Sequence, residues 1–194
     1  MMSVVSSSIF LKVLSNIMNI DDAIRGRRSI RNYKSDDVKE ELVREIIEAA
    51  TYAPSAKNGQ QWRFTVLTGE SKDKFTDMYR SELSKLTFDV GSSFGSCTMM
   101  EEAPVVIIVW NTNEYGWPTE IHSVSAAIQN MLLKAHAIGL GTCWIGDIFY
   151  TYEAIMDYFK KPWKLLAAIT VGWPDVSPGP KPRLSVNEVV EFMS

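Results

Sequence analysis

Hydrophobic residues recur at helical spacing in two long stretches of the chain. Within residues 39–53 they fall on one face of a helix that ends before Pro54, because proline disfavours a helical residue ahead of it. Residues 120–138 predict a second helix, apolar or small over most of its circumference, which indicates burial either centrally or in a subunit interface. Shorter helices are predicted for residues 21–26, 71–85 and 152–159.

Three further stretches have the length and pattern of strands. Residues 63–68 alternate in polarity, whereas residues 104–110 (PVVIIVW) and 165–171 are almost entirely apolar and predict strands buried on both faces. Between these elements, composition predicts a polar loop at 54–62 and a mobile segment at 91–96. The proline-rich C-terminal region is expected to be extended.

The chain shows no internal repeat and no domain boundary, and 194 residues are enough for one well-packed core. We therefore predict a single domain over residues 1–194, in which residues 1–20 form an N-terminal extension. This extension lacks the basic start of a signal peptide, and its apolar run is too short to span a membrane. A cytoplasmic protein without a membrane partner is expected.

Charge and composition exclude several classes of function. A net charge of −3 and a pI near 5.5 argue against a nucleic-acid partner. The two cysteines and two histidines are too few and too far apart for a disulfide scaffold or a zinc site, so no metal is expected.

One short segment stands out chemically against this acidic background. Residues 27–33, RRSIRNY, place three arginines and a serine within five positions. Guanidinium groups present a planar fork of donors that suits phosphate or carboxylate, so the segment is a candidate anion clamp. The alternative is a basic turn that faces solvent, since most charge clusters do so.

Four separated motifs resemble those of the nitroreductase-like flavoproteins. RRSIRNY, PSAKNGQQW, GLGTCWIG and KPRLS occur in the family's order, and the resemblance runs from Asp21 to Leu184. It implies an α+β fold with a central mixed β-sheet flanked by helices. It also implies an intertwined homodimer that binds two FMN molecules at its interface.

The resemblance assigns cofactor-binding roles to positions in all four motifs. Arg27 and Ser29 would hold the FMN phosphate and ribityl chain, and Arg31 would lie near the ring, where a cation favours the negatively charged reduced flavin. The other positions implied are Arg28 in the first motif, Pro54, Ser55, Ala56 and Asn58 from the second subunit, Ile145 and Gly146 near the ring edge, and Lys181 and Arg183 at the phosphate. No catalytic side chain is implied, because the flavin carries the chemistry.

The implied activity is hydride transfer from NADH or NADPH to FMN and on to a small-molecule electron acceptor, such as a nitroaromatic or a quinone, by a ping-pong mechanism. Two alternatives stay open: a same-fold flavoenzyme of other chemistry (dehalogenation, desaturation or flavin fragmentation), and a non-catalytic flavin-binding or redox-sensing protein. The region 79–100 matches no family pattern, so the acceptor is open. Phe94 and Trp117 are the candidates for lining its pocket.

Overall fold

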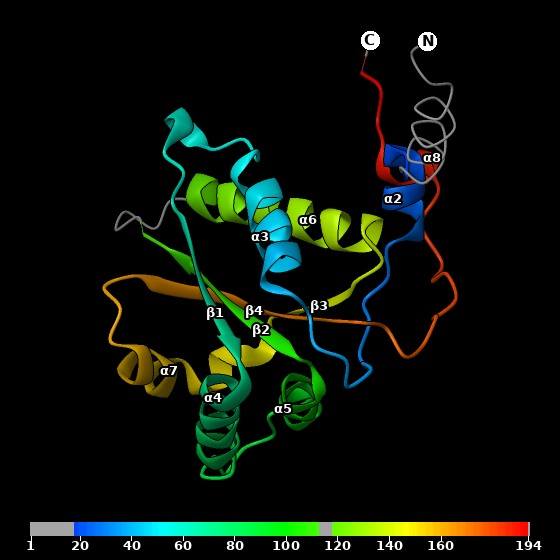
Figure 1. The fold of residues 1–194 in the computed structure, drawn as a ribbon. Coiled ribbons are helices and arrows are strands. Elements are labelled where there is room, and N and C mark those ends of the chain that lie inside the picture. Colours follow the sequence, from blue (N-terminus) through cyan, green and yellow to red (C-terminus); the bar gives the residue numbers. More distant parts are fainter. Residues whose placement is uncertain (1–17, 113–117, 194) are drawn as a thin grey trace, which may run out of the picture.

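A four-stranded sheet with the order β1-β2-β4-β3 lies at the centre of the protein (Figure 1). The computed structural model describes residues 18–112 and 118–193, so most of the predicted N-terminal extension and Trp117 lie outside the described residues. The strands are β1 (Trp62–Thr68), β2 (Val105–Asn111), β3 (Gly141–Ile145) and β4 (Lys164–Gly172). Each neighbouring pair of strands is antiparallel. A mixed sheet was expected, and the parallel pairing found among the described residues is a single bridge between Ser29 and Thr142.

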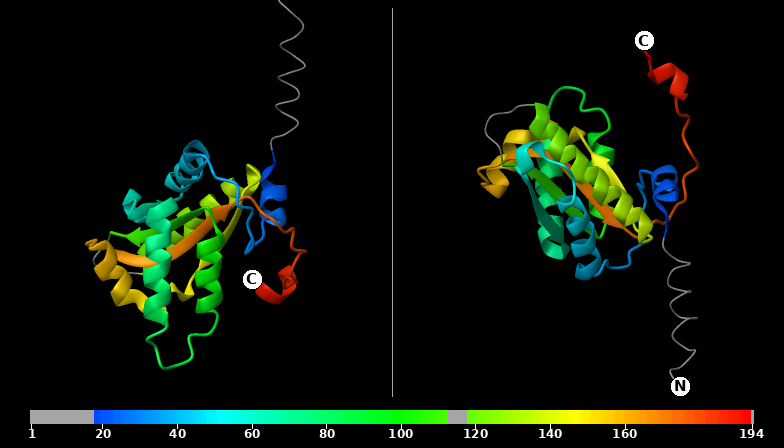
Figure 2. Two further views of the ribbon diagram at one scale, coloured as in Figure 1. Left: turned by 60° about the horizontal axis from the view of Figure 1, so that its bottom comes forward. Right: turned by 90° about the horizontal axis from the view of Figure 1, so that it is seen from above.

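Helices cover both faces of this sheet (Figures 1 and 2). On one face lie α3 (Glu40–Thr51) and α6 (Pro118–Ala137), and on the other α4 (Gly69–Leu83), α5 (Ser93–Glu102) and α7 (Tyr152–Phe159). Every residue of β2 is buried, as its unbroken apolar run predicts, because its side chains enter a separate apolar core on each face. The predicted α+β architecture is confirmed.

The predicted helices agree with the structure to within two residues at each end, which is the usual uncertainty of helix boundaries. The first of them, α2 (Ile20–Gly26), is capped by Asn19, whose side chain accepts a hydrogen bond from the backbone N–H of Asp22. The described residues also form three short helical turns: η1 (Ala56–Asn58), η2 (Asp147–Thr151) and α8 (Val186–Val189).

The prediction of a mobile segment at residues 91–96 is wrong. Gly91 and Ser92 form a turn, and Ser93 begins helix α5. The side chains of Ser93, Ser96 and Cys97 are buried, so tertiary packing overrides the loop-like composition.

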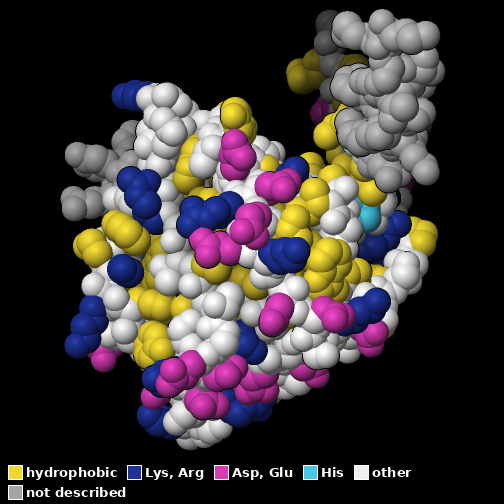
Figure 3. Space-filling view, in the orientation of Figure 1, with side chains coloured by type: hydrophobic (Ala, Val, Ile, Leu, Met, Phe, Trp, Pro, Cys, Tyr) yellow, Lys and Arg dark blue, Asp and Glu magenta, His cyan; other side chains and the backbone are white. Residues whose placement is uncertain are grey.

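The surface carries intermixed charges. On the face in Figure 3, acidic and basic side chains alternate over the lower part of the molecule, where α4 lies. Many of them form pairs, such as Lys74 with Glu70 at 2.8 Å and Arg80 with Glu101 at 2.7 Å. Within the described ranges, no helix has both the length and the hydrophobicity to cross a bilayer.

Candidate functional site

The segment RRSIRNY is fixed against the edge of the sheet at β3. The backbone N–H of Ile30 donates to the carbonyl of Thr142 at 2.9 Å, beside the Ser29–Thr142 bridge. The hydroxyl of Tyr33 donates to the Ile30 carbonyl at 2.7 Å and lies 2.7 Å from the Thr170 hydroxyl of β4. These bonds fix the backbone of the loop that carries the arginines.

A glycine makes this close approach possible. A Cβ added at Gly141, the first residue of β3, would lie 2.8 Å from side-chain atoms of Ile30. Real side chains do not tolerate that distance, so only glycine lets the loop reach the strand without a shift.

A small cavity unites the two predicted halves of the anion clamp. Its volume is about 210 Å³. Its lining residues come from the first motif and from the C-terminal segment: Arg27, Arg28, Ser29, Arg31, Pro178, Gly179, Lys181 and Arg183. The fold therefore brings five cationic side chains from opposite ends of the sequence to one place.

These cations have no acidic counterpart. None of the ion pairs found among the described residues includes an arginine or lysine of this cavity. Burial lowers the pKa of the Arg27 guanidinium, and the neighbouring charges of Arg183 and Arg28 lower it further. Such crowding of like charges disfavours the protein alone and favours a bound anion. A phosphate monoester fits this donor set in size and charge.

The arginines of the first motif divide into different tasks. Arg28 donates from Nη1 to the carbonyls of Arg25 (2.6 Å) and Arg27 (3.0 Å), so it also stabilises the loop backbone. Arg31 makes only a long contact of 3.5 Å to the Ser29 carbonyl. Its guanidinium is therefore available to a ligand.

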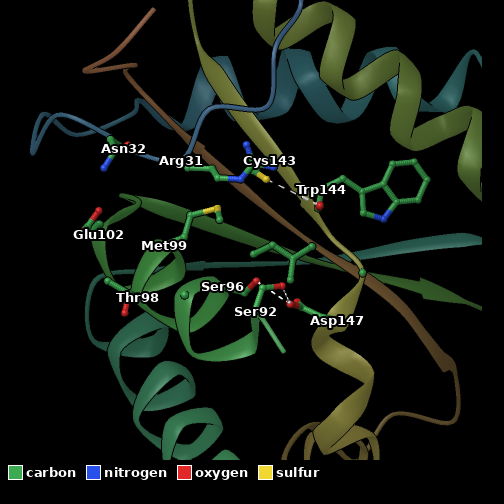
Figure 4. A pocket seen from close by; sticks show the side chains of 13 residues that line it. Arg31, Asn32, Ser92, Ser96, Thr98, Met99, Glu102, Cys143, Trp144 and Asp147 are labelled. Atoms are coloured by element: carbon green, nitrogen blue, oxygen red, sulfur yellow. Dashed lines mark hydrogen bonds between the residues drawn. The ribbon is translucent and has the colours of Figure 1, made fainter. Parts of the chain in front are cut away.

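Arg31 also lines a second, larger pocket of about 640 Å³ (Figure 4). One wall is the loop at Arg31 and Asn32, and another is helix α5. The third wall is the end of β3 and the residues after it, including the predicted Ile145 and Gly146. Because Arg31 belongs to both cavities, the cationic cavity and the larger pocket adjoin, and together they suit a ligand with a phosphate at one end and a flat group at the other.

Among the polar residues of this pocket that the sequence analysis missed, three form a hydrogen-bonded group. The carboxylate Oδ2 of Asp147 accepts hydrogen bonds from the hydroxyls of Ser92 (2.7 Å) and Ser96 (3.1 Å). Asp147 directly follows the motif residue Gly146, and this adjacency is the one signal that could have indicated it. Ser92 and Ser96 carried no such signal, because their segment was expected to be mobile.

The pocket also contains a thiol, that of Cys143, which is buried beside Arg31 and Asp147. Burial is the main cause that raises its pKa; the Arg31 charge opposes this effect and the Asp147 charge adds to it. A thiol with a raised pKa is a poor nucleophile, which agrees with a packing role.

The residues of the second motif do not line the two cavities. Pro54, Ser55, Ala56 and Asn58 line neither cavity, and their predicted contact with FMN across a subunit interface stays a prediction. Their loop is strained, since Lys57, Asn58 and Gln60 all have positive φ angles of 47–54°. Such backbone strain is concentrated at functional sites in proteins.

Of the two predicted acceptor-pocket residues, Phe94 is exposed on α5 and is not among the residues that line the larger pocket. Trp117 lies outside the described residues. Trp144, which sequence analysis did not single out, lines the pocket and is partly exposed.

Known proteins resemble this chain in both sequence and fold. The sequence profile of the Nitroreductase family matches residues 24–173. A candidate NADH dehydrogenase/NAD(P)H nitroreductase of Methanothermobacter thermautotrophicus is 32% identical over 172 residues, which cover 84% of this chain and 81% of the relative. The 5,6-dimethylbenzimidazole synthase of Rhodospirillum rubrum is 26% identical over 173 residues, 80% of this chain and 82% of that enzyme.

The solved structures extend the likeness to the fold. The crystal structure of a candidate nitroreductase in complex with FMN, from Desulfovibrio desulfuricans, superposes with a TM-score of 0.77 at 31% identity. The match covers 91% of this chain and 98% of that one. With the family profile spanning both the RRSIRNY loop and the pocket wall at β3, this chain belongs to the nitroreductase family.

Proposed function

We propose that this protein is an FMN-dependent NAD(P)H oxidoreductase. The observation that carries the proposal is the cationic cavity at Arg27, Lys181 and Arg183, which contains no carboxylate and adjoins a pocket with room for a planar ring system. The complex of the Desulfovibrio relative with FMN supports the identity of the ligand.

The residues of both cavities have distinct roles in this proposal. Arg27, Lys181 and Arg183 bind the phosphate, and the Ser29 hydroxyl donates to the phosphate or the ribityl chain. Arg31 lies at the junction of the cavities and supplies a positive charge to the ring. When bound, FMN supplies the capacity to accept and release a hydride; the side chains bind it, orient it and set its electrostatic surroundings.

The proposed functional unit is a homodimer. Ser55 and Asn58 line neither the cationic cavity nor the larger pocket of their own chain, although they belong to a strained loop in one of the four family-like motifs. A second copy that brings this loop to the pocket gives these residues a ligand to contact. Pro54 and Ala56 belong to the same contact.

The proposed reaction has two halves. NADH or NADPH transfers a hydride to the flavin and leaves, and a nitroaromatic, quinone or similar acceptor then binds in the same place and takes the electrons. Because both substrates stack on one ring in turn, ping-pong kinetics are expected.

Anaerobic spectroscopy tests this function directly. The purified protein should bind FMN, lose the visible flavin absorbance when NADH or NADPH is added, and regain it on addition of a nitroaromatic or a quinone. Steady-state rates should give parallel double-reciprocal lines. A protein that binds no FMN, or whose FMN neither nucleotide reduces, would refute the proposal.

Flavin fragmentation is the second candidate, favoured by the similarity to 5,6-dimethylbenzimidazole synthase. Chromatography after incubating the reduced holoprotein with oxygen distinguishes the two. Formation of 5,6-dimethylbenzimidazole would support fragmentation, whereas return of intact FMN would support the oxidoreductase.

A further inference from the structure

The larger pocket has charges of opposite sign on opposite sides. In Figure 4, Arg31 lies at the upper side, on the RRSIRNY loop, and Asp147 lies at the lower side, where β3 leads into η2. If the flavin ring occupies this pocket, as the proposed function has it, the ring lies between the cation of Arg31 and the carboxylate of Asp147.

The carboxylate of Asp147 is held in place. Its Oδ2 accepts hydrogen bonds from Ser92 and Ser96, and the Ser93 hydroxyl lies 3.4 Å from the Asp147 backbone carbonyl. All three serines lie at the start of α5, so the rigid helix fixes the position of the charge.

This negative charge is only partly compensated. Two hydroxyl groups donate to Oδ2, but Oδ1 is buried and accepts no hydrogen bond from any described residue. None of the ion pairs in the described part of the chain includes Asp147. Asp147 as a whole is half-buried, but its Oδ1 is shielded from solvent, so little water screens the charge on that side of the carboxylate.

The charges of Arg31 and Asp147 both act on groups inside the larger pocket. Cys143, on the pocket wall, has a thiol pKa that Arg31 lowers and Asp147 raises, on top of the larger effect of burial. A ligand group in the pocket is subject to the same two opposing fields.

We propose that Asp147, held by Ser92 and Ser96, lowers the reduction potential of the flavin bound in this pocket and thereby offsets Arg31. Hydride uptake delivers two electrons and one proton to the ring and leaves NAD(P)⁺, so the ring gains one negative charge. A fixed carboxylate disfavours that charge, and a guanidinium favours it. The consequence is a reduced flavin that donates electrons to acceptors more readily than Arg31 alone would permit.

The alternative is a purely structural role, in which Asp147 only ties α5 to the end of β3. The reduction potential distinguishes the two, because a structural tie affects stability and not the charge near the ring. Asp147→Asn is the informative variant, since asparagine keeps an oxygen that can accept from both serines. Asp147→Ser removes the charge with a smaller polar group and serves if the amide disturbs folding.

The experiment is a spectral titration of the FMN-loaded protein against a reference dye of known potential. Asp147→Asn is expected to shift the equilibrium toward reduced flavin at least tenfold, which is about 30 mV for a two-electron couple. Glu102→Gln is the matched control: Glu102 lines the same pocket but is exposed on α5, so water screens its charge and the shift should be less than threefold.

The outcomes separate this inference from the proposed function. An Asp147→Asn or Asp147→Ser protein that binds FMN and melts like the wild type, yet keeps the wild-type potential, overturns the inference alone. Equal shifts in Asp147→Asn and Glu102→Gln also overturn it. A wild-type protein that binds no FMN refutes the proposed function and the inference together.

Discussion

Arg27 is expected to lower the stability of the folded protein and yet to strengthen FMN binding at the cationic cavity. Its guanidinium is partly buried next to Arg28 and Arg183, with no carboxylate nearby, and its pKa is lowered by burial first and by those charges second. In the Arg27→Ala protein, FMN should bind roughly 10- to 100-fold more weakly, because a hydrogen bond to a charged group contributes about 1.5–3 kcal/mol. Fluorescence titration with FMN measures this loss.

The same substitution should leave the FMN-free protein as stable as the wild type or slightly more stable, since it removes repulsion between like charges. Thermal unfolding at low salt without FMN tests this. Arg44→Ala is the control: Arg44 is exposed on α3, paired with Glu40, and should change neither quantity by much. A marked drop in melting temperature for FMN-free Arg27→Ala would mean that Arg27 stabilises the fold.

At the scale of elements, the site depends on how closely the RRSIRNY loop approaches β3. Gly141→Ala would place a methyl group 2.8 Å from Ile30, so the loop or the strand must shift. We expect a loss of about 1–3 kcal/mol in the free energy of unfolding, as for other overpacked sites, together with weaker FMN binding. Chemical denaturation and FMN titration measure the two effects.

Gly95→Ala adds the same methyl group where no atom lies within 4 Å, inside helix α5. Because Gly95 lines the larger pocket, this control is limited to the FMN-free protein, which the substitution should stabilise by about 0.5–1 kcal/mol through helix propensity alone. If Gly141→Ala were equally harmless, the loop would not be held by the close contact with β3.

Local pattern predicted most elements but not the whole site. The unbroken apolar run of β2 and the helical spacing in α3 identify these elements, because each depends on nearby residues only. Helix α5 was missed since its serines and glycine resemble a loop, and it forms because Ser93 and Cys97 are buried against the rest of the fold. The hydrogen bond from Ser92 to Asp147 joins positions 55 residues apart, so no local pattern contains it.

The two halves of the cationic cavity, at Arg27 and at Arg183, were predicted to lie together only because of the family resemblance.

At the scale of the whole molecule, the C-terminal segment points to a second subunit. The chain after β4 leaves the body and projects outward with α8 (Figure 2). Its apolar side chains are left in solvent, and Phe192 and Met193 are 88% and 91% exposed. Soluble monomers rarely leave such a group of large apolar residues uncovered, so a second copy of the chain is expected to cover them.

Ending the chain at Ser185 removes these residues but keeps Lys181 and Arg183 of the cationic cavity. Both cores lie outside the deleted segment, so circular dichroism and the melting of the body should change little. Sedimentation velocity should show at least a tenfold weaker dimer, since an apolar side chain buried at an interface contributes about 1.5–3 kcal/mol. FMN binding should weaken in parallel if Ser55 and Asn58 of a second copy complete the site.

The full-length double variant Phe192→Ser with Met193→Ser should also weaken the dimer, but by less than the truncation. A truncated protein that dimerises as tightly as the wild type would place the subunit contact elsewhere, and the exposed apolar residues of the C-terminal segment would then need another partner.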